Sequence, residues 1–211
     1  MHGLRHTLPW LVAVLLLGAC AGAPPVEPGA VPAVIQGTDS ATDSATDAAP
    51  GTMPLLRLPP ASLGRTLQLQ QQITVQYPSP QGEQTRDILA LLEADAAHTR
   101  LAAMAGGQVL ARLDWDGRDL HVTRAPWAPA ELVPERILSD LQLSLWPVPA
   151  IAAVLPAGWH VEDMGDVRRL RAGNEVVAEV RHPDAITTVF DQRRAGYRLT
   201  IRTLQRTGGQ P

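Results

Sequence analysis

The stretch TLQLQQQITVQY, residues 66–77, alternates polar and apolar side chains with a period of two. Its even positions are all Thr or Gln, and its odd positions are apolar except for Gln71. This is the period of a β-strand, whose successive side chains point to opposite faces of a sheet. A sheet that contains this strand has one wet face and one covered face, which favours antiparallel pairing.

Short turns follow this strand and divide the chain into hairpins. Pro78–Gly82 has the composition of a turn, and Gly106-Gly107 and Asp116-Gly117 form tight turns. We therefore predict a meander of antiparallel strands that continues to residue 124. The apolar runs between the turns predict its further strands at 87–93, 99–105, 109–115 and 120–124.

A helical pattern begins after the proline-rich break at residues 126–129. Pro134 suits the first turn of a helix. Apolar residues then recur at helical spacing as far as Leu145, with polar residues on the other face, and Pro147 ends the helix. A further short helical turn is predicted at 151–155.

Strands resume after residue 158 and close the domain. The order of strands, helices and strands predicts an α+β domain. We expect a curved antiparallel sheet, an open half-barrel, whose concave apolar face is covered by the helices. The closing strands are predicted at 159–164, 167–171, 176–181, 186–190 and 197–204.

The N-terminus predicts an exported protein with a lipid anchor. Residues 1–10 contain Arg5 and no acidic residue, and residues 11–17 are a short apolar run. This is the build of a secretory signal, and the run is shorter than the roughly 20 residues that span a bilayer. Leu17–Cys20 resembles the bacterial lipobox, which implies a lipoprotein signal peptide at 1–19 and acyl chains on Cys20. In the lipoproteins that this motif resembles, Asp after the lipidated Cys commonly retains the protein in the inner membrane. Ala21 occupies that position here, which implies sorting to the periplasmic face of the outer membrane.

The next segment, residues 20–55, is rich in Ala, Pro, Gly, Thr, Ser and Asp. It includes the repeat DSATDSATD at residues 39–47. Such a composition buries too little apolar surface to offset the entropy of ordering. We predict a lipidated Cys with a disordered tether at 20–55, followed by one folded domain at 56–211.

The composition excludes several classes of function. The chain has 21 acidic residues against 18 basic residues, a net charge of −3, which is no footprint for a nucleic acid. Cys20 is the single cysteine, so an intramolecular disulfide and a cysteine zinc site are excluded. We predict no nucleic-acid partner and no cofactor.

The sequence also contains no catalytic constellation. The histidines at 98, 121, 160 and 182 have no second ligand at metal spacing, and no Gly-x-Ser-x-Gly or P-loop motif occurs. Asp114, Asp116 and Asp119 bracket a tight turn, which favours a role in the turn over a calcium site. We predict a protein that is not an enzyme, with no catalytic residue and no metal site.

The apolar residues of the sheet and the helix fit two interpretations, because a packed core and a hydrophobic pocket have the same composition. In the first, the concave face is simply filled. In the second, it binds a ligand, with helix 132–146 as a lid. The lining residues that we predict for the pocket are Leu69, Ile73, Val75, Leu101, Leu113, Trp115, Leu138, Leu141, Leu145 and Trp146.

These features together resemble the LolA/LolB-like lipoproteins, and in particular an uncharacterised family of small bacterial lipoproteins. The resemblance rests on the lipidated Cys with its tether, the long first strand, the two tight hairpins, the proline-bounded insert at 132–155 and the closing strand. It implies that Met104, within 99–107, lies at the tip of a protruding loop used in acyl-chain transfer.

The function that this resemblance implies is non-enzymatic. The protein would be held at the membrane by its N-terminal acyl chains. It would bind or transfer an acylated ligand, such as a lipid, lipoprotein acyl chains or a polyene lipid. The alternative is an accessory lipoprotein with a filled core and no ligand, which binds a protein partner in an envelope complex.

Overall fold

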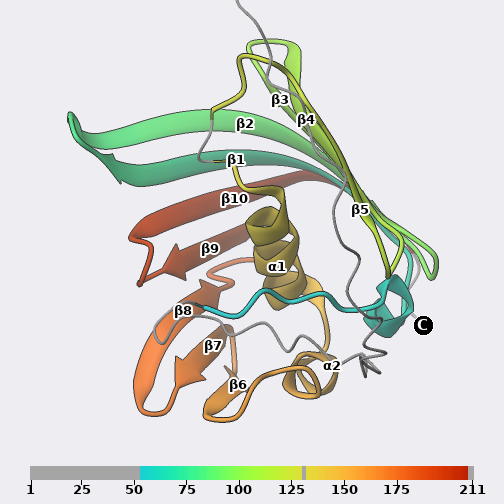
Figure 1. Ribbon diagram of the computed structural model, residues 1–211, viewed down its shortest axis with the longest axis vertical. Helices are drawn as coiled ribbons and strands as arrows, with labels where there is room; N and C mark the ends of the chain where they lie inside the picture. The colour runs from blue at the N-terminus through green and yellow to red at the C-terminus, as the bar shows by residue number, and fades with distance from the viewer. Residues whose placement is uncertain (1–52, 130–131, 209–211) are drawn as a thin grey trace, which may run out of the picture. The chain divides into compact units, whose positions relative to one another are not determined.

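A computed structural model describes residues 53–129 and 132–208. Over these ranges the chain forms a ten-stranded antiparallel sheet and two short α-helices (Figure 1). A 3-10 turn, η1, precedes the first strand at Pro60–Leu63. The strands are β1 (Leu67–Ser79), β2 (Gly82–Ala94), β3 (Thr99–Ala105), β4 (Gln108–Trp115), β5 (Leu120–Arg124), β6 (Trp159–Met164), β7 (Val167–Ala172), β8 (Glu175–Arg181), β9 (Thr187–Gln192) and β10 (Tyr197–Thr207), and the helices are α1 (Pro134–Leu145) and α2 (Val148–Ala152).

Two meanders make up the sheet, one from β1 to β5 and one from β6 to β10. They join where β1 pairs with β10, so the order is β5-β4-β3-β2-β1-β10-β9-β8-β7-β6. β1 pairs with β2 along its whole length, from Leu67 opposite Ala94 to Ser79 opposite Gly82. One hydrophobic cluster includes Leu92 of β2 and Leu170 of β7. The sheet therefore curves until strands well separated in its order share one core.

Most predicted strands agree closely with the structure, and β3, β5 and β6 have the predicted bounds. β2 begins five residues earlier than predicted, at Gly82 instead of Asp87. Its first residues carry no apolar alternation and extend the strand because they pair with the end of β1. In the turn between β3 and β4, Gly106 and Gly107 have φ values of 57° and 77°, which the primed hairpin turns require.

The predicted α+β fold with helices covering the concave face is wrong. The described chain is mostly antiparallel sheet, and its α-helices have only 12 and five residues. A helix of 12 residues is about 18 Å long, whereas ten strands at about 4.8 Å spacing extend over about 43 Å. Pro147 and Pro149 interrupt the helical pattern, so the insert forms no helix long enough to cover this sheet.

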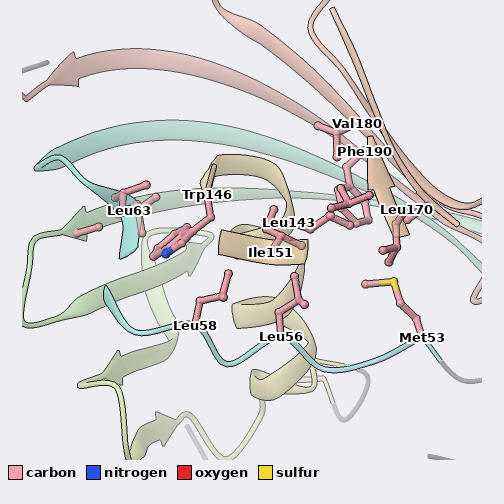
Figure 2. Close-up of a cluster of buried hydrophobic side chains, with 14 of the residues drawn as sticks. Met53, Leu56, Leu58, Leu63, Leu143, Trp146, Ile151, Leu170, Val180 and Phe190 are labelled. Atoms are coloured by element: carbon pink, nitrogen blue, oxygen red, sulfur yellow. The ribbon is translucent and has the colours of Figure 1, made fainter. Parts of the chain in front are cut away.

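An extended N-terminal segment, residues 53–63, packs where helices were expected. Met53, Leu56, Leu58 and Leu63 are at most 3% exposed. Figure 2 shows Leu56 and Leu58 of this segment in the same cluster as Trp146. The predicted domain start at residue 56 therefore falls inside a packed segment that already includes Met53.

The polar face of α1 holds this segment in place. The Oγ atom of Ser139 accepts a hydrogen bond of 3.0 Å from the backbone N–H of Leu56. Gln142 is fully buried, and its side-chain amide accepts from the N–H of Leu58 and donates to its carbonyl, both at 2.9 Å. These side chains satisfy backbone groups that no strand pairs, and Ser139 and Gln142 on the polar face of the helix are therefore buried.

Candidate functional site

A cavity of about 650 Å³ lies between the sheet and α1. This volume is typical of a pocket for a small ligand. The sheet supplies apolar side chains from five adjacent strands, and α1 supplies three more across the cavity. These lining residues are Ile73 and Val75 of β1, Ile88 and Ala90 of β2, Leu101, Ala103 and Ala105 of β3, Leu110 of β4, Leu199 and Ile201 of β10, and Ile137, Leu141 and Leu145 of α1.

The exposure of neighbouring residues distinguishes this cavity from the packed core. On α1, Leu138 and Leu143 are at most 1% exposed. Leu141 and Leu145, on the same helix, are only partly buried and line the cavity. Protein interiors are normally close-packed and contain few voids larger than a water molecule. The concave face is therefore filled at one end and open at the other.

The structure divides the ten predicted pocket residues between these two regions. Ile73, Val75, Leu101, Leu141 and Leu145 line the cavity. The others belong to the packed core and are Leu69, Leu113, Trp115, Leu138 and Trp146.

The N-terminal segment is the reason for this division. The indole N–H of Trp115 donates to the carbonyl of Leu58 at 2.7 Å. The indole N–H of Trp146 donates to the hydroxyl of Ser62 at 3.0 Å. Both rings are thus held against residues 53–63, and apolar packing on that side leaves no space for a ligand.

Met104 does not lie at the tip of a protruding loop. It is a half-buried residue within β3, opposite Val109 of β4 and Leu89 of β2. The register shifts between Ala103 and Met104, and the hairpin turns two residues later, at Gly106-Gly107. Cys20, the predicted lipid attachment site, lies outside the described residues.

The polar residues of the cavity wall that the sequence analysis missed include Arg136 and Asp140 of α1, and Tyr197 of β10. The hydroxyl of Tyr197 donates a short hydrogen bond to Oδ2 of Asp140. Nη2 of Arg136 donates to the carbonyl of Met53 at 2.9 Å. Their sequence spacing places Arg136 and Asp140 one helical turn apart, but nothing in the sequence connects either of them with Tyr197.

Each of the two helix residues keeps one atom without a hydrogen-bond partner. Among residues 53–129 and 132–208, Nη1 of Arg136 and Oδ1 of Asp140 are buried and unpaired. Asp140 as a whole is 7% exposed. Buried polar atoms are nearly always hydrogen-bonded in folded proteins. In the described chain the wall of the cavity therefore offers one unpaired donor and one unpaired acceptor to a ligand, which its apolar strands do not.

Burial raises the pKa of Asp140 from 3.8 to about 7, although the hydrogen bond from Tyr197 and the charge of Arg136 act in the opposite direction. Burial and the neighbouring Asp140 raise the pKa of Tyr197 well above its ordinary value. Because the folded protein binds the Asp140 proton more tightly than the unfolded chain does, this group makes folding less favourable as pH rises from about 4 to 7. Retaining a carboxyl group here costs stability near neutral pH.

A second, more polar groove of about 680 Å³ lies beside the β1–β2 hairpin and strands β8 to β10. Its charged side chains bind one another. Arg181 contacts Asp191 at 2.8 Å, and Arg193 contacts Glu179 at 3.2 Å. These pairs neutralise one another, and the groove is less suited to an apolar ligand than the cavity behind α1.

Asp116 and His98 have local partners that account for their positions. Oδ1 of Asp116 accepts from the backbone N–H groups of Arg118 and Asp119 at 2.7 and 2.8 Å, which lowers the pKa of Asp116 and closes the β4–β5 turn. Nδ1 of His98 lies 2.8 Å from Asp114. In the described part of the chain, His, Cys, Asp and Glu side chains form no group of three that suits a metal ion.

No α-helix within residues 53–129 and 132–208 is long and apolar enough to cross a membrane. A search among curated proteins gives no match.

A family comparison gives a match that spans the whole sheet. Residues 68–205, more than half of the 211-residue chain, match the family described as "Protein of unknown function (DUF3261)". The matched region begins in β1 and ends in β10, so it includes the strands and the helix that enclose the cavity. Nothing in this match refers to LolB. The protein belongs to the DUF3261 family.

Proposed function

We propose that this protein binds, and carries or receives, a lipid with a long acyl or polyene chain at the periplasmic face of the outer membrane. The observation that supports this function best is the apolar cavity between the sheet and α1. The resemblance to LolA/LolB-like lipoproteins and the lipobox at Cys20 add the cellular setting. The function is non-enzymatic and needs no metal or cofactor.

The energetics favour long chains over short ones. Burial of an acyl chain gains about 0.8 kcal/mol per methylene. Association costs an estimated 4–15 kcal/mol in lost freedom of motion. A chain of about five methylenes gains roughly 4 kcal/mol, which only equals the lower end of this cost, and each further methylene adds to the net gain. We therefore expect the cavity to select long-chain lipids.

Native mass spectrometry tests this function directly. The full chain is prepared with Cys20→Ser, so that no acyl group of its own anchor enters the cavity, and it is purified without detergent. It is then incubated with a lipid extract from the host membrane. We expect one lipid of defined mass to remain bound, with a stoichiometry of one, because its chain binds in the single apolar cavity that the described residues form behind α1.

The opposite outcome has a clear meaning. A protein that carries no lipid and takes up none contradicts the proposed function. A stable protein partner recovered by crosslinking in cells would then favour the alternative, an accessory lipoprotein of an envelope complex.

The lipid anchor gives a separate prediction. Cys20→Ser should move the exported protein from the membrane fraction to the aqueous fraction, because stable attachment requires more than one acyl chain and the variant carries none. Labelled palmitate should enter the original protein and not the variant. Ser40→Ala, in the same predicted tether, is the matched control and should stay in the membrane fraction. Equal incorporation of labelled palmitate in all three proteins would exclude Cys20 as the lipid attachment site.

A further inference from the structure

We propose that the cavity recognises a free carboxylic acid at the end of its ligand, through Arg136 and Asp140. This inference rests on the proposed function and specifies the chemical class of the ligand. The aliphatic or polyene chain lies against the apolar strands, and the acid lies against the polar wall of α1. Nη1 of Arg136 donates to one ligand oxygen, and Oδ1 of Asp140 shares a proton with the other.

The arrangement of unpaired atoms supports this assignment. Arg136 and Asp140 are four residues apart on α1, so their side chains lie on one face of the helix. Both residues line the cavity, and each has one buried atom without a partner in the described chain, a donor on Arg136 and an acceptor on Asp140. A carboxylic acid offers an acceptor and a donor on adjacent oxygens, and binding it satisfies both protein atoms.

The other two atoms of the pair are already held. Nη2 of Arg136 donates to the carbonyl of Met53 at 2.9 Å. Oδ2 of Asp140 accepts from the hydroxyl of Tyr197. These contacts fix the two side chains before a ligand arrives, so they need little reorganisation on binding.

The charges around the cavity favour a carboxylic acid over a phosphate. The charged residues in its lining are Arg86, Asp87, Arg136 and Asp140. Arg86 and Asp87 are exposed residues of β2, and they bind Tyr77 and Thr74, both at 2.6 Å. A phosphate group would place up to two negative charges beside Asp140, and the single positive charge of Arg136 would not compensate them. A carboxyl group that shares one proton with Asp140 leaves this wall electrically neutral.

The proton balance makes binding depend on pH. The groups that face Asp140 are Arg136 on its own helix and Tyr197 on β10, and neither changes charge near neutral pH. Below about pH 7 Asp140 already holds its proton, so a fatty-acid anion binds without proton uptake. Above that pH one proton must be taken up with the ligand, and affinity should fall by about tenfold per pH unit.

Fluorescence titration with two matched probes tests the inference. The probes are parinaric acid, a fluorescent polyene fatty acid, and its methyl ester, which has the same chain without a free acid. We use the full chain with Cys20→Ser. At about pH 6 the acid should bind at least roughly tenfold more tightly than the ester, the effect of one lost hydrogen bond to a charged group. Only the affinity for the acid should decline between about pH 7 and pH 9.

Two variants separate the roles of the polar residues. Asp140→Asn supplies a permanent donor, and it should keep the affinity for the acid while abolishing the pH dependence. Arg136→Gln should weaken binding of the acid by at least roughly tenfold more than binding of the ester, and thermal unfolding verifies that the variant remains folded. Arg112→Gln, an exposed residue of β4, is the matched control and should behave as the unsubstituted protein.

The outcomes distinguish the two proposals. Preference for the acid, with a pH dependence that disappears in Asp140→Asn, supports the inference. Equal affinity for acid and ester at every pH overturns it, while the lipid-binding function stands. Failure of both probes to bind contradicts the proposed function itself.

Discussion

Ala103→Trp is expected to weaken binding of parinaric acid by about 100-fold while the protein remains folded. Ala103 is a residue of β3 whose side chain lines the cavity opposite α1. An indole ring at this position occupies space that three or four methylenes of the ligand would fill. At about 0.8 kcal/mol per methylene, the loss is roughly 3 kcal/mol, or about 100-fold in affinity. Fluorescence titration of the probe measures this change.

Ala102→Trp provides the matched control. Ala102 is the preceding residue of the same strand, so its side chain points to the opposite face of the sheet. The same indole group there should leave affinity unchanged. Equal affinity in all three proteins would show that the ligand does not bind behind α1, and thermal unfolding of each variant verifies that the fold persists.

Gln142→Leu is expected to lower the free energy of unfolding by about 2–4 kcal/mol, although it replaces a fully buried polar residue with an apolar one of similar size. Gln142 makes two hydrogen bonds of 2.9 Å to the backbone of Leu58. Leucine leaves the buried N–H of Leu58 unpaired, at a cost of about 1–3 kcal/mol, and removes one further hydrogen bond of about 1 kcal/mol. Urea unfolding at equilibrium measures the difference.

Another glutamine, which lies on the sheet instead of on α1, serves as the control for this substitution. Gln68 of β1 is exposed, and Gln68→Leu should change stability by less than about 0.5 kcal/mol. If Gln142→Leu is equally harmless, residues 53–63 are not held to α1 in the way described. If it is as destabilising as expected, the segment is an integral part of the folded unit.

The stretch at residues 66–77 predicted the central strand of the sheet with an accuracy of one or two residues. Alternation is a local property, because each side chain alternates with its immediate neighbours. The turn at Gly106-Gly107 was also predicted, because it too depends on residues that are neighbours in the chain. The local nature of alternation also explains the error at the start of β2, where pairing with β1 extends a strand that has no alternation of its own.

The helical insert shows where local patterns fail. The start of α1 at Pro134 was predicted, and so was its apolar face. The fold class was wrong, because a helix pattern gives no information about how much of a sheet the helix covers. Ser139 and Gln142 on the polar face of α1 are buried, since they bind an N-terminal segment more than 80 residues away in the chain.

The sequence by itself determined the strands, their turns, the position of α1 and the apolar character of one face, because each of these follows from neighbours along the chain. Only the tertiary structure decided that β1 pairs with β10, and that residues 53–63 fill one end of the concave face and leave the other open. It also decided that Arg136, Asp140 and Tyr197 share a cavity wall. The physical reason is that these features depend on contacts between distant segments. Apolar residues also have the same sequence pattern whether they pack against other side chains or line a cavity.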